Sequence, residues 1–178
     1  LKMLSQRRFS FEEYVATVRK KTGELLALPV EGAALIAGKE AEQAQALAEP
    51  FIDLGTLFQL QDDVLDLYGD KGRGLMGSDL YEGKVSALVV AHLFKHPEDT
   101  VWLVDLLRSG REETPIQEVK RAIDRFRDTG ALDYVISFVM KIVERLFQSP
   151  VLRDESELHN VAMELVVRAM RPIQHILE

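Results

Sequence analysis

The stretch FQLQDDVLD, residues 58–66, places three carboxylates inside an apolar pattern of helical period. Asp62 and Asp66 are four residues apart, so on a helix they share one face, while Asp63 lies about 100° around the axis. Like charges at this spacing repel, and aspartate is unfavourable in mid-helix. A divalent cation would offset this repulsion, and Mg²⁺ commonly takes one or two protein carboxylates together with phosphate oxygens. A solvated acidic face is the simpler alternative, but these acids interrupt a run of apolar residues, which favours a metal site.

The rest of the sequence also predicts helices, and we find no strand-like alternation of useful length. Ser10 and Glu13 have the spacing of a helix N-terminal capping box. The fold class is therefore predicted to be all-α, as a helical bundle. The expected helices cover residues 10–21, 22–36, 41–68, 82–95 and 97–108, followed by one capped by Thr114, two separated by Gly130 and a last one over 156–177 with a kink at Pro172.

Composition limits the partners that the chain can have. The 22 basic and 29 acidic residues give a net charge of −7, which argues against nucleic acid as a ligand. The sequence contains no cysteine, which excludes disulfides, zinc–thiolate sites and thiol catalysis. The most apolar stretch, residues 24–38, is interrupted by Glu24, Pro29 and Glu31, so we do not expect it to span a membrane. We expect a cytoplasmic globular protein.

The basic residues and histidines allow structural as well as functional interpretations. Lys21 closes the first predicted helix, where a cation also interacts favourably with the helix dipole. Lys84 is predicted at the start of a helix, where a cation opposes the dipole and gains nothing unless an anion is near. His92 and His96 are four residues apart, but no glutamate lies between them in the zinc-binding pattern. We interpret the histidines as surface or packing residues.

Four segments then occur in the order and spacing of a known family. They are Lys21-Thr22, Phe58-Gln59, the aspartate motif at 62–66 and Glu82-Gly83-Lys84. Together they resemble the second half of an all-trans isoprenyl diphosphate synthase, a member of the polyprenyl synthetase family. The resemblance implies that residues 1–178 are the C-terminal part of a polyprenyl synthetase domain, a helical bundle around a deep apolar cavity.

The resemblance also implies an activity and roles for the charged residues. The family joins isopentenyl diphosphate to an allylic diphosphate, such as geranyl, farnesyl or geranylgeranyl diphosphate. Asp62 and Asp66 would hold Mg²⁺ on the allylic diphosphate, and Asp63 would support them. Lys21 and Lys84 would bind the same diphosphate. Cations suit this reaction, because negative charge grows on the departing diphosphate in the transition state.

Further residues receive roles from the same resemblance. Thr22 and Gln59 would turn oxygen dipoles toward the allylic cation, and Phe58 would line the isopentenyl site. The family commonly has a lysine before the segment GSD; this sequence has Arg73 there instead, and we expect Arg73 to serve as the loop cation for the substrate.

Residues 1–178 contain neither the family's first aspartate-rich motif nor the basic residues that hold isopentenyl diphosphate. We therefore expect the C-terminal portion of a longer synthase, inactive in isolation, that needs a missing N-terminal half or a partner chain; homodimers are usual in the family. Two alternatives stay open: a non-catalytic partner subunit of a heteromeric synthase, and a helical Mg²⁺–diphosphate-binding protein related to terpene cyclases. The Lys-Thr and Glu-Gly-Lys segments argue against the second.

Overall fold

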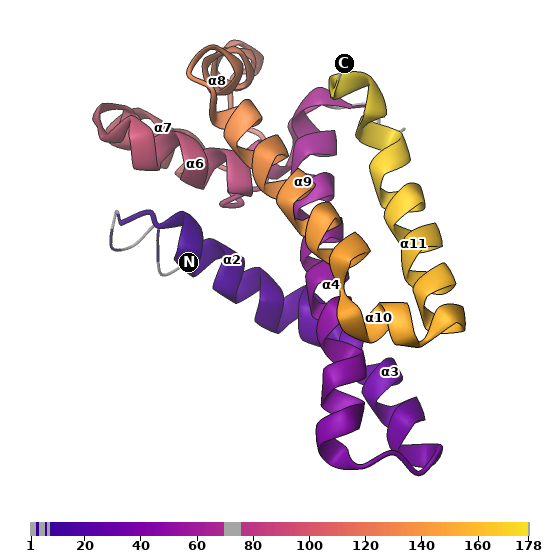
Figure 1. The fold of residues 1–178 in the computed structure, drawn as a ribbon. Helices are drawn as coiled ribbons and strands as arrows, with labels where there is room; N and C mark the ends of the chain where they lie inside the picture. The colour runs from indigo at the N-terminus through magenta and orange to yellow at the C-terminus, as the bar shows by residue number, and fades with distance from the viewer. Residues whose placement is uncertain (1–2, 4–5, 7, 70–75, 178) are drawn as a thin grey trace. The chain divides into compact units, whose positions relative to one another are not determined.

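The computed structural model describes residues 3, 6, 8–69 and 76–177. These residues form helices joined by short turns, and no strand occurs among them (Figure 1). The all-α prediction is confirmed. The elements in chain order are α2 (Phe11–Val18), the π-helical turn η1 (Arg19–Gly23), α3 (Glu24–Ile36), α4 (Ala41–Tyr68), α5 (Ser78–Tyr81), α6 (Ala87–Lys95), the 3₁₀ turn η2 (Pro97–Asp99), α7 (Thr100–Arg108), α8 (Ile116–Asp128), α9 (Ala131–Gln148), α10 (Pro150–Asp154), α11 (Ser156–Met170) and the 3₁₀ helix η3 (Arg171–Ile176).

The chain divides into two compact units. The first unit contains residues 1–14, 62–137 and 175–178, and the second contains residues 15–61 and 138–174. Among the described helices, none is long and apolar enough to cross a membrane.

Helix α4 has the bounds that the sequence predicts, Ala41–Tyr68. Its core face consists of leucines and valine at steps of three and four residues, as in an amphipathic helix. Leu54, Leu57, Leu60, Val64 and Leu67 are at most 1% exposed. The aspartate motif lies within this buried pattern, so the helix holds its carboxylates at fixed positions.

In the second unit, two glycines let η1 approach α4 closely. A Cβ atom on Gly55 would lie 2.7 Å from the carbonyl oxygen of Thr22, and one on Gly23 would lie 2.8 Å from Ile52. Such distances leave no room for a methyl group. The pair of glycines therefore brings the backbone of Thr22 directly against α4. An ion pair between Arg19 and Asp53 joins the same two segments.

In the first unit, α6 is almost fully enclosed, with residues 87–93 all buried. It packs against α8. The sequence predicts this helix from residue 82, but it begins at Ala87, where the Ser86 hydroxyl accepts a hydrogen bond from the Val89 amide at 3.5 Å. Gly83 ends any earlier helix, because its φ of +66° lies outside the right-handed helical region. The prediction that Lys84 starts a helix is therefore wrong.

Two other helix ends differ from the sequence prediction. The Thr114 hydroxyl does not cap α8, because it donates a hydrogen bond back to the Gly110 carbonyl at 2.7 Å. The last α-helix ends at Met170, and the chain continues around Pro172 as a 3₁₀ helix rather than as a kinked α-helix.

Candidate functional site

The three aspartates of α4 lie in different surroundings. Asp62 is exposed, whereas Asp63 is 2% exposed and Asp66 is 3% exposed. A buried carboxylate is costly unless hydrogen bonds stabilise it. Both buried aspartates have such bonds within the first unit, and the partners differ.

Asp63 connects α4 to two other helices. One of its carboxylate oxygens accepts a hydrogen bond from the Tyr14 hydroxyl of α2, and the same oxygen accepts one from the Ala87 amide at 2.7 Å. Ala87 is the first residue of α6, where unpaired amides and the helix dipole favour a negative charge. Burial, and then the charge of Asp63, raise the pKa of Tyr14 well above its usual range. The contact therefore keeps Tyr14 protonated as the donor.

Asp66 holds the short helix α5. Its carboxylate accepts hydrogen bonds from the Ser78 hydroxyl at 2.6 Å and from the Asp79 amide at 3.0 Å, and its backbone carbonyl accepts one from the Gly77 amide at 2.8 Å. Gly77 has a φ of +79°, which a glycine adopts without strain. Asp66 thus fixes the turn that carries Asp79.

Asp79 in turn holds Lys84. The Lys84 ammonium lies 2.9 Å from the Asp79 carboxylate and 2.7 Å from that of Glu82, and the Lys84 amide donates to the Asp79 carbonyl at 2.8 Å. The hydrogen bonds that the ammonium donates, first to Glu82 and then to Asp79, raise the pKa of Lys84 above its usual range. A continuous set of contacts therefore runs from the aspartate motif through α5 to a charged lysine whose side chain is 56% exposed.

The structure explains why residue 83, next to Lys84, is a glycine. A Cβ atom at this position would lie 2.3 Å from the Leu107 carbonyl oxygen of α7, and the φ of +66° is unfavourable for any other residue. The Glu82-Gly83-Lys84 segment is consequently a tight turn against α7 that presents the lysine.

The remaining sequence-predicted residues belong to the second unit. Lys21 and Thr22 lie in the π-helical turn η1, and Lys21 is exposed. π-Helical turns of this kind are frequent at functional sites. The Thr22 hydroxyl donates a hydrogen bond to the Gln59 side-chain oxygen at 3.4 Å, so the two residues predicted to act together are in contact. Phe58 is half-buried beside Gln59 on α4. Arg73 lies outside the described residues.

A further cluster in the first unit surrounds a histidine. The ring of His92 is fully buried, with Nε2 at 2.8 Å from the Asp99 carboxylate and Nδ1 at 2.9 Å from the Thr129 hydroxyl. Asp99 also accepts a hydrogen bond from Arg125 at 2.9 Å. Burial lowers the pKa of His92. These contacts agree with the packing role expected for this histidine.

Comparison with known proteins identifies the family. The family model described as polyprenyl synthetase matches residues 2–126. The chain belongs to the polyprenyl synthetase family. A short chain isoprenyl diphosphate synthase of Methanocaldococcus jannaschii is 39% identical over 118 residues, which are 65% of this chain and 36% of that protein. A geranylgeranyl pyrophosphate synthase of Geoglobus acetivorans is 32% identical over 154 residues, 86% of this chain and 46% of that protein.

Solved structures agree with this assignment. The structure of geranylgeranyl pyrophosphate synthetase from Pyrococcus horikoshii superposes with a TM-score of 0.69 at 25% identity, covering 88% of this chain and 49% of that one. The polyprenyl synthetase resemblance seen in the sequence is confirmed. The chain spans about half the length, or less, of the relatives named above.

The three aspartates of α4 fit only one mode of magnesium binding. Among the described residues, no group of three or more acidic or histidine side chains is arranged to enclose a metal. Asp63 and Asp66 use oxygens in hydrogen bonds to the protein, while Asp62 is exposed. Mg²⁺ is commonly bound by one or two carboxylates plus waters and phosphate oxygens, and these residues fit that mode rather than an all-protein cage.

Two residues of the candidate site have no functional role in the sequence prediction. Tyr14 has the position of a helix-staple residue, and Asp79 is part of the loop segment GSD. Asp79 could have been noticed, because an acid five residues before a lysine across a glycine turn is a natural ion pair. Nothing local in the sequence indicates the Tyr14 contact, because its partner, Asp63, is 49 residues away.

Proposed function

We propose that this chain supplies the second aspartate-rich half of an isoprenyl diphosphate synthase, a prenyltransferase that condenses isopentenyl diphosphate with an allylic diphosphate. The observation that carries the proposal is the set of contacts from Asp66 through Asp79 to Lys84. It ties a cation to the same helix as the exposed carboxylate of Asp62. An exposed lysine that is held by the helix carrying an exposed carboxylate suits the binding of a magnesium diphosphate.

Each residue has a distinct part in this proposal. Asp62 binds Mg²⁺, which would neutralise charge on the diphosphate as the allylic carbon–oxygen bond breaks. Asp63 and Asp66 support the site by holding α6 and α5 rather than by enclosing the ion. Lys84 exchanges its contacts with Asp79 and Glu82 for diphosphate oxygens, which preserves its charge pairing.

The residues of the second unit receive their roles in this proposal from the family resemblance. Lys21 binds the diphosphate from its exposed position on η1. Thr22 and Gln59 turn their oxygen dipoles toward the allylic cation, supported by their mutual hydrogen bond. Phe58 lines the isopentenyl site. The new carbon–carbon bond uses the double-bond electrons of isopentenyl diphosphate, and the proton then lost passes to the released diphosphate. Arg73 remains a prediction for the loop cation.

The test measures incorporation of radiolabelled isopentenyl diphosphate into geranyl and farnesyl diphosphate. We expect no elongation by this chain alone, and Mg²⁺-dependent elongation when it is mixed with the part of the Geoglobus acetivorans enzyme that it does not match. Absence of prenyl products in that mixture would contradict the proposal. Release of a hydrocarbon without use of isopentenyl diphosphate would indicate the cyclase-like alternative instead.

Assembly and location follow the same family resemblance. We propose that the working enzyme is a cytoplasmic homodimer of complete domains, each including a half supplied by a missing segment or a partner chain. Light scattering of the active mixture tests this: a mass of two complete domains agrees with it, and a single-domain mass contradicts it.

A further inference from the structure

Helix α3 of the second unit is mostly apolar in composition, yet almost none of it is buried. Its 13 residues include only two charged ones, Glu24 and Glu31, and Ala27 is the one residue of the helix that is buried. A helix with an apolar stripe normally packs that stripe against other protein. Most of this helix therefore lacks, among the described residues, the packing that its apolar composition predicts.

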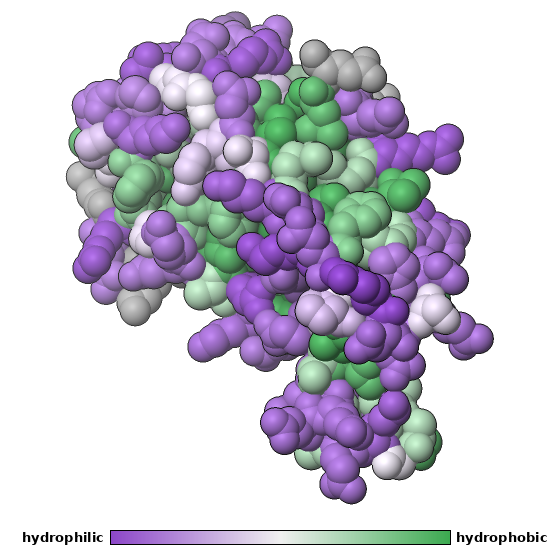
Figure 2. Space-filling view, viewed as in Figure 1, coloured by the Kyte–Doolittle hydropathy of each residue, from purple (hydrophilic) through white to green (hydrophobic). Residues whose placement is uncertain are grey.

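The uncovered residues form one continuous stripe. Leu25 is 70% exposed, Leu28 is 63%, Leu35 is 47% and Ile36 is 90%. At about 100° per residue these positions fall within a sector of roughly 100°. A Cβ atom on Gly32, in the same sector, would meet nothing within 4 Å. Figure 2 shows green apolar surface between purple polar side chains where Figure 1 places α3 and the start of α4. Exposed apolar patches of this kind mark interaction sites.

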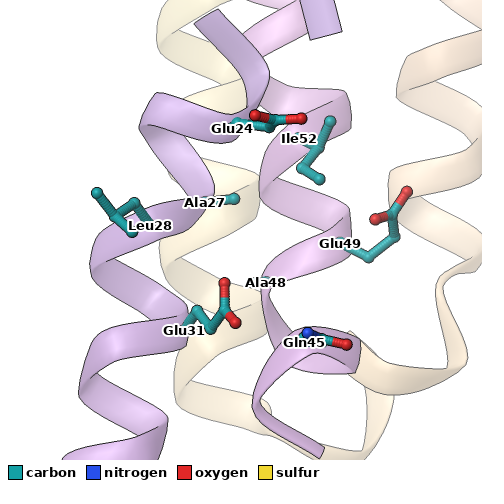
Figure 3. Close-up of a pocket in the computed structure, with 8 residues that line it drawn as sticks. All are labelled: Glu24, Ala27, Leu28, Glu31, Gln45, Ala48, Glu49 and Ile52. Atoms are coloured by element: carbon teal, nitrogen blue, oxygen red, sulfur yellow. The ribbon is translucent and has the colours of Figure 1, made fainter. Parts of the chain in front are cut away.

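A groove with an acidic rim borders the stripe. It lies between α3 and α4 and has a volume of about 360 Å³. Figure 3 shows Ala27 and Ala48 between the two helices, with the carboxylates of Glu24, Glu31 and Glu49 around them. Both alanines are buried, at 4% and 3% exposed, so small side chains form the floor. An apolar floor with acidic edges is complementary to a helix that has an apolar face and basic flanks.

We propose that this face of α3 docks the other half of a polyprenyl synthetase domain, through a helix that is apolar on one side and carries lysine or arginine beside the glutamates. The inference rests on the proposed function. The length of the relatives supports the choice of partner, because this chain covers only 46% and 49% of two of them. Each of these relatives therefore contains about as many further residues as it shares with this chain. A second copy of this chain fits less well, because α3 paired with itself would bring two acidic rims together.

The test is a binding titration that does not depend on turnover. The probe is the part of the Geoglobus acetivorans enzyme that this chain does not match, titrated by calorimetry against the wild-type chain and two variants. Leu28→Glu alters the stripe, and Val167→Glu on α11 is the matched control, because both residues belong to the second unit and both are 63% exposed. We expect saturable binding to the wild type, about 10- to 100-fold weaker binding to Leu28→Glu, and less than a twofold change for Val167→Glu.

Three outcomes would overturn the inference. Equal weakening by both variants, or no binding of the probe, removes α3 as the docking face. Self-association of the chain that Leu28→Glu abolishes would assign the stripe to a second copy. Circular dichroism confirms folding of the probe and of each variant, and Ile36→Glu, at a position that is 90% exposed, provides a second alteration of the stripe. Binding with these variant effects but without prenyl products would retain the docking face and reject the proposed function.

Discussion

The hydrogen bond between Tyr14 and Asp63 should contribute more to stability than any neutral tyrosine contact in the same unit. Tyr14→Phe removes only the hydroxyl and leaves the buried carboxylate with the Ala87 amide at 2.7 Å. Hydrogen bonds to charged groups contribute about 1.5–3 kcal/mol, against about 0.5–1.5 kcal/mol for neutral pairs. We therefore expect Tyr14→Phe to lower the free energy of unfolding by about 2 kcal/mol.

Tyr68 provides the matched control. Its hydroxyl donates to the backbone carbonyl of Ile123 at 2.7 Å, so Tyr68→Phe removes the same atom from a bond to a neutral acceptor. We expect a loss of about 1 kcal/mol. Urea denaturation followed by the fluorescence of Trp102, the only tryptophan of the chain, reports on the unit that contains both tyrosines. The reasoning is refuted if Tyr68→Phe costs as much as Tyr14→Phe, or if Tyr14→Phe costs less than about 0.5 kcal/mol.

Two further predictions use matched variants. Gly55→Ala should destabilise the protein by about 1–3 kcal/mol, because its methyl group would lie 2.7 Å from the Thr22 carbonyl oxygen. The methyl group of Gly32→Ala would meet no atom within 4 Å, so this variant should be neutral or more stable by up to about 1 kcal/mol. Thermal melts that rank the two variants in the opposite order would contradict this prediction. Burial lowers the pKa of His92 below its ordinary 6.5, so its contribution to stability is complete above pH 6.5 and is lost as the pH falls toward the folded-state pKa. Between pH 7.5 and 5, the free energy of unfolding should fall less steeply with pH in His92→Gln than in the wild type. His175→Gln, at an exposed position, should keep the wild-type slope. Equal slopes in all three proteins would contradict the prediction.

The sequence predicts most clearly what depends on local pattern. The bounds of α4 follow from the helical spacing of its apolar residues, and Gly130, with a φ of +72°, separates α8 from α9 as expected. The start of α6 is missed, because the sequence prediction placed Glu82-Gly83-Lys84 inside the helix. Only the contact of Gly83 with Leu107, which is distant in sequence, requires the turn.

The roles of the aspartates show the same limit. Spacing predicts that Asp62 and Asp66 share a helical face, but it cannot tell which carboxylate is exposed. That depends on tertiary partners, the Ser78 hydroxyl and Asp79 amide for Asp66 and the Ala87 amide for Asp63. Metal binding by all three remains a prediction, and the contacts favour Asp62 as the residue that binds directly.

The central claim is that Asp62 holds a magnesium diphosphate on this chain. The most direct measurement is a calorimetric titration of farnesyl diphosphate, with and without Mg²⁺, into the wild type and two variants. Asp62→Asn alters the proposed site, and Asp105→Asn is the control at another exposed helical aspartate. The account predicts Mg²⁺-dependent binding that Asp62→Asn weakens at least tenfold and Asp105→Asn leaves unchanged, in line with the loss of a hydrogen-bonded charge worth ~1.5–3 kcal/mol. Binding that is independent of Mg²⁺, or equal in the two variants, would contradict it.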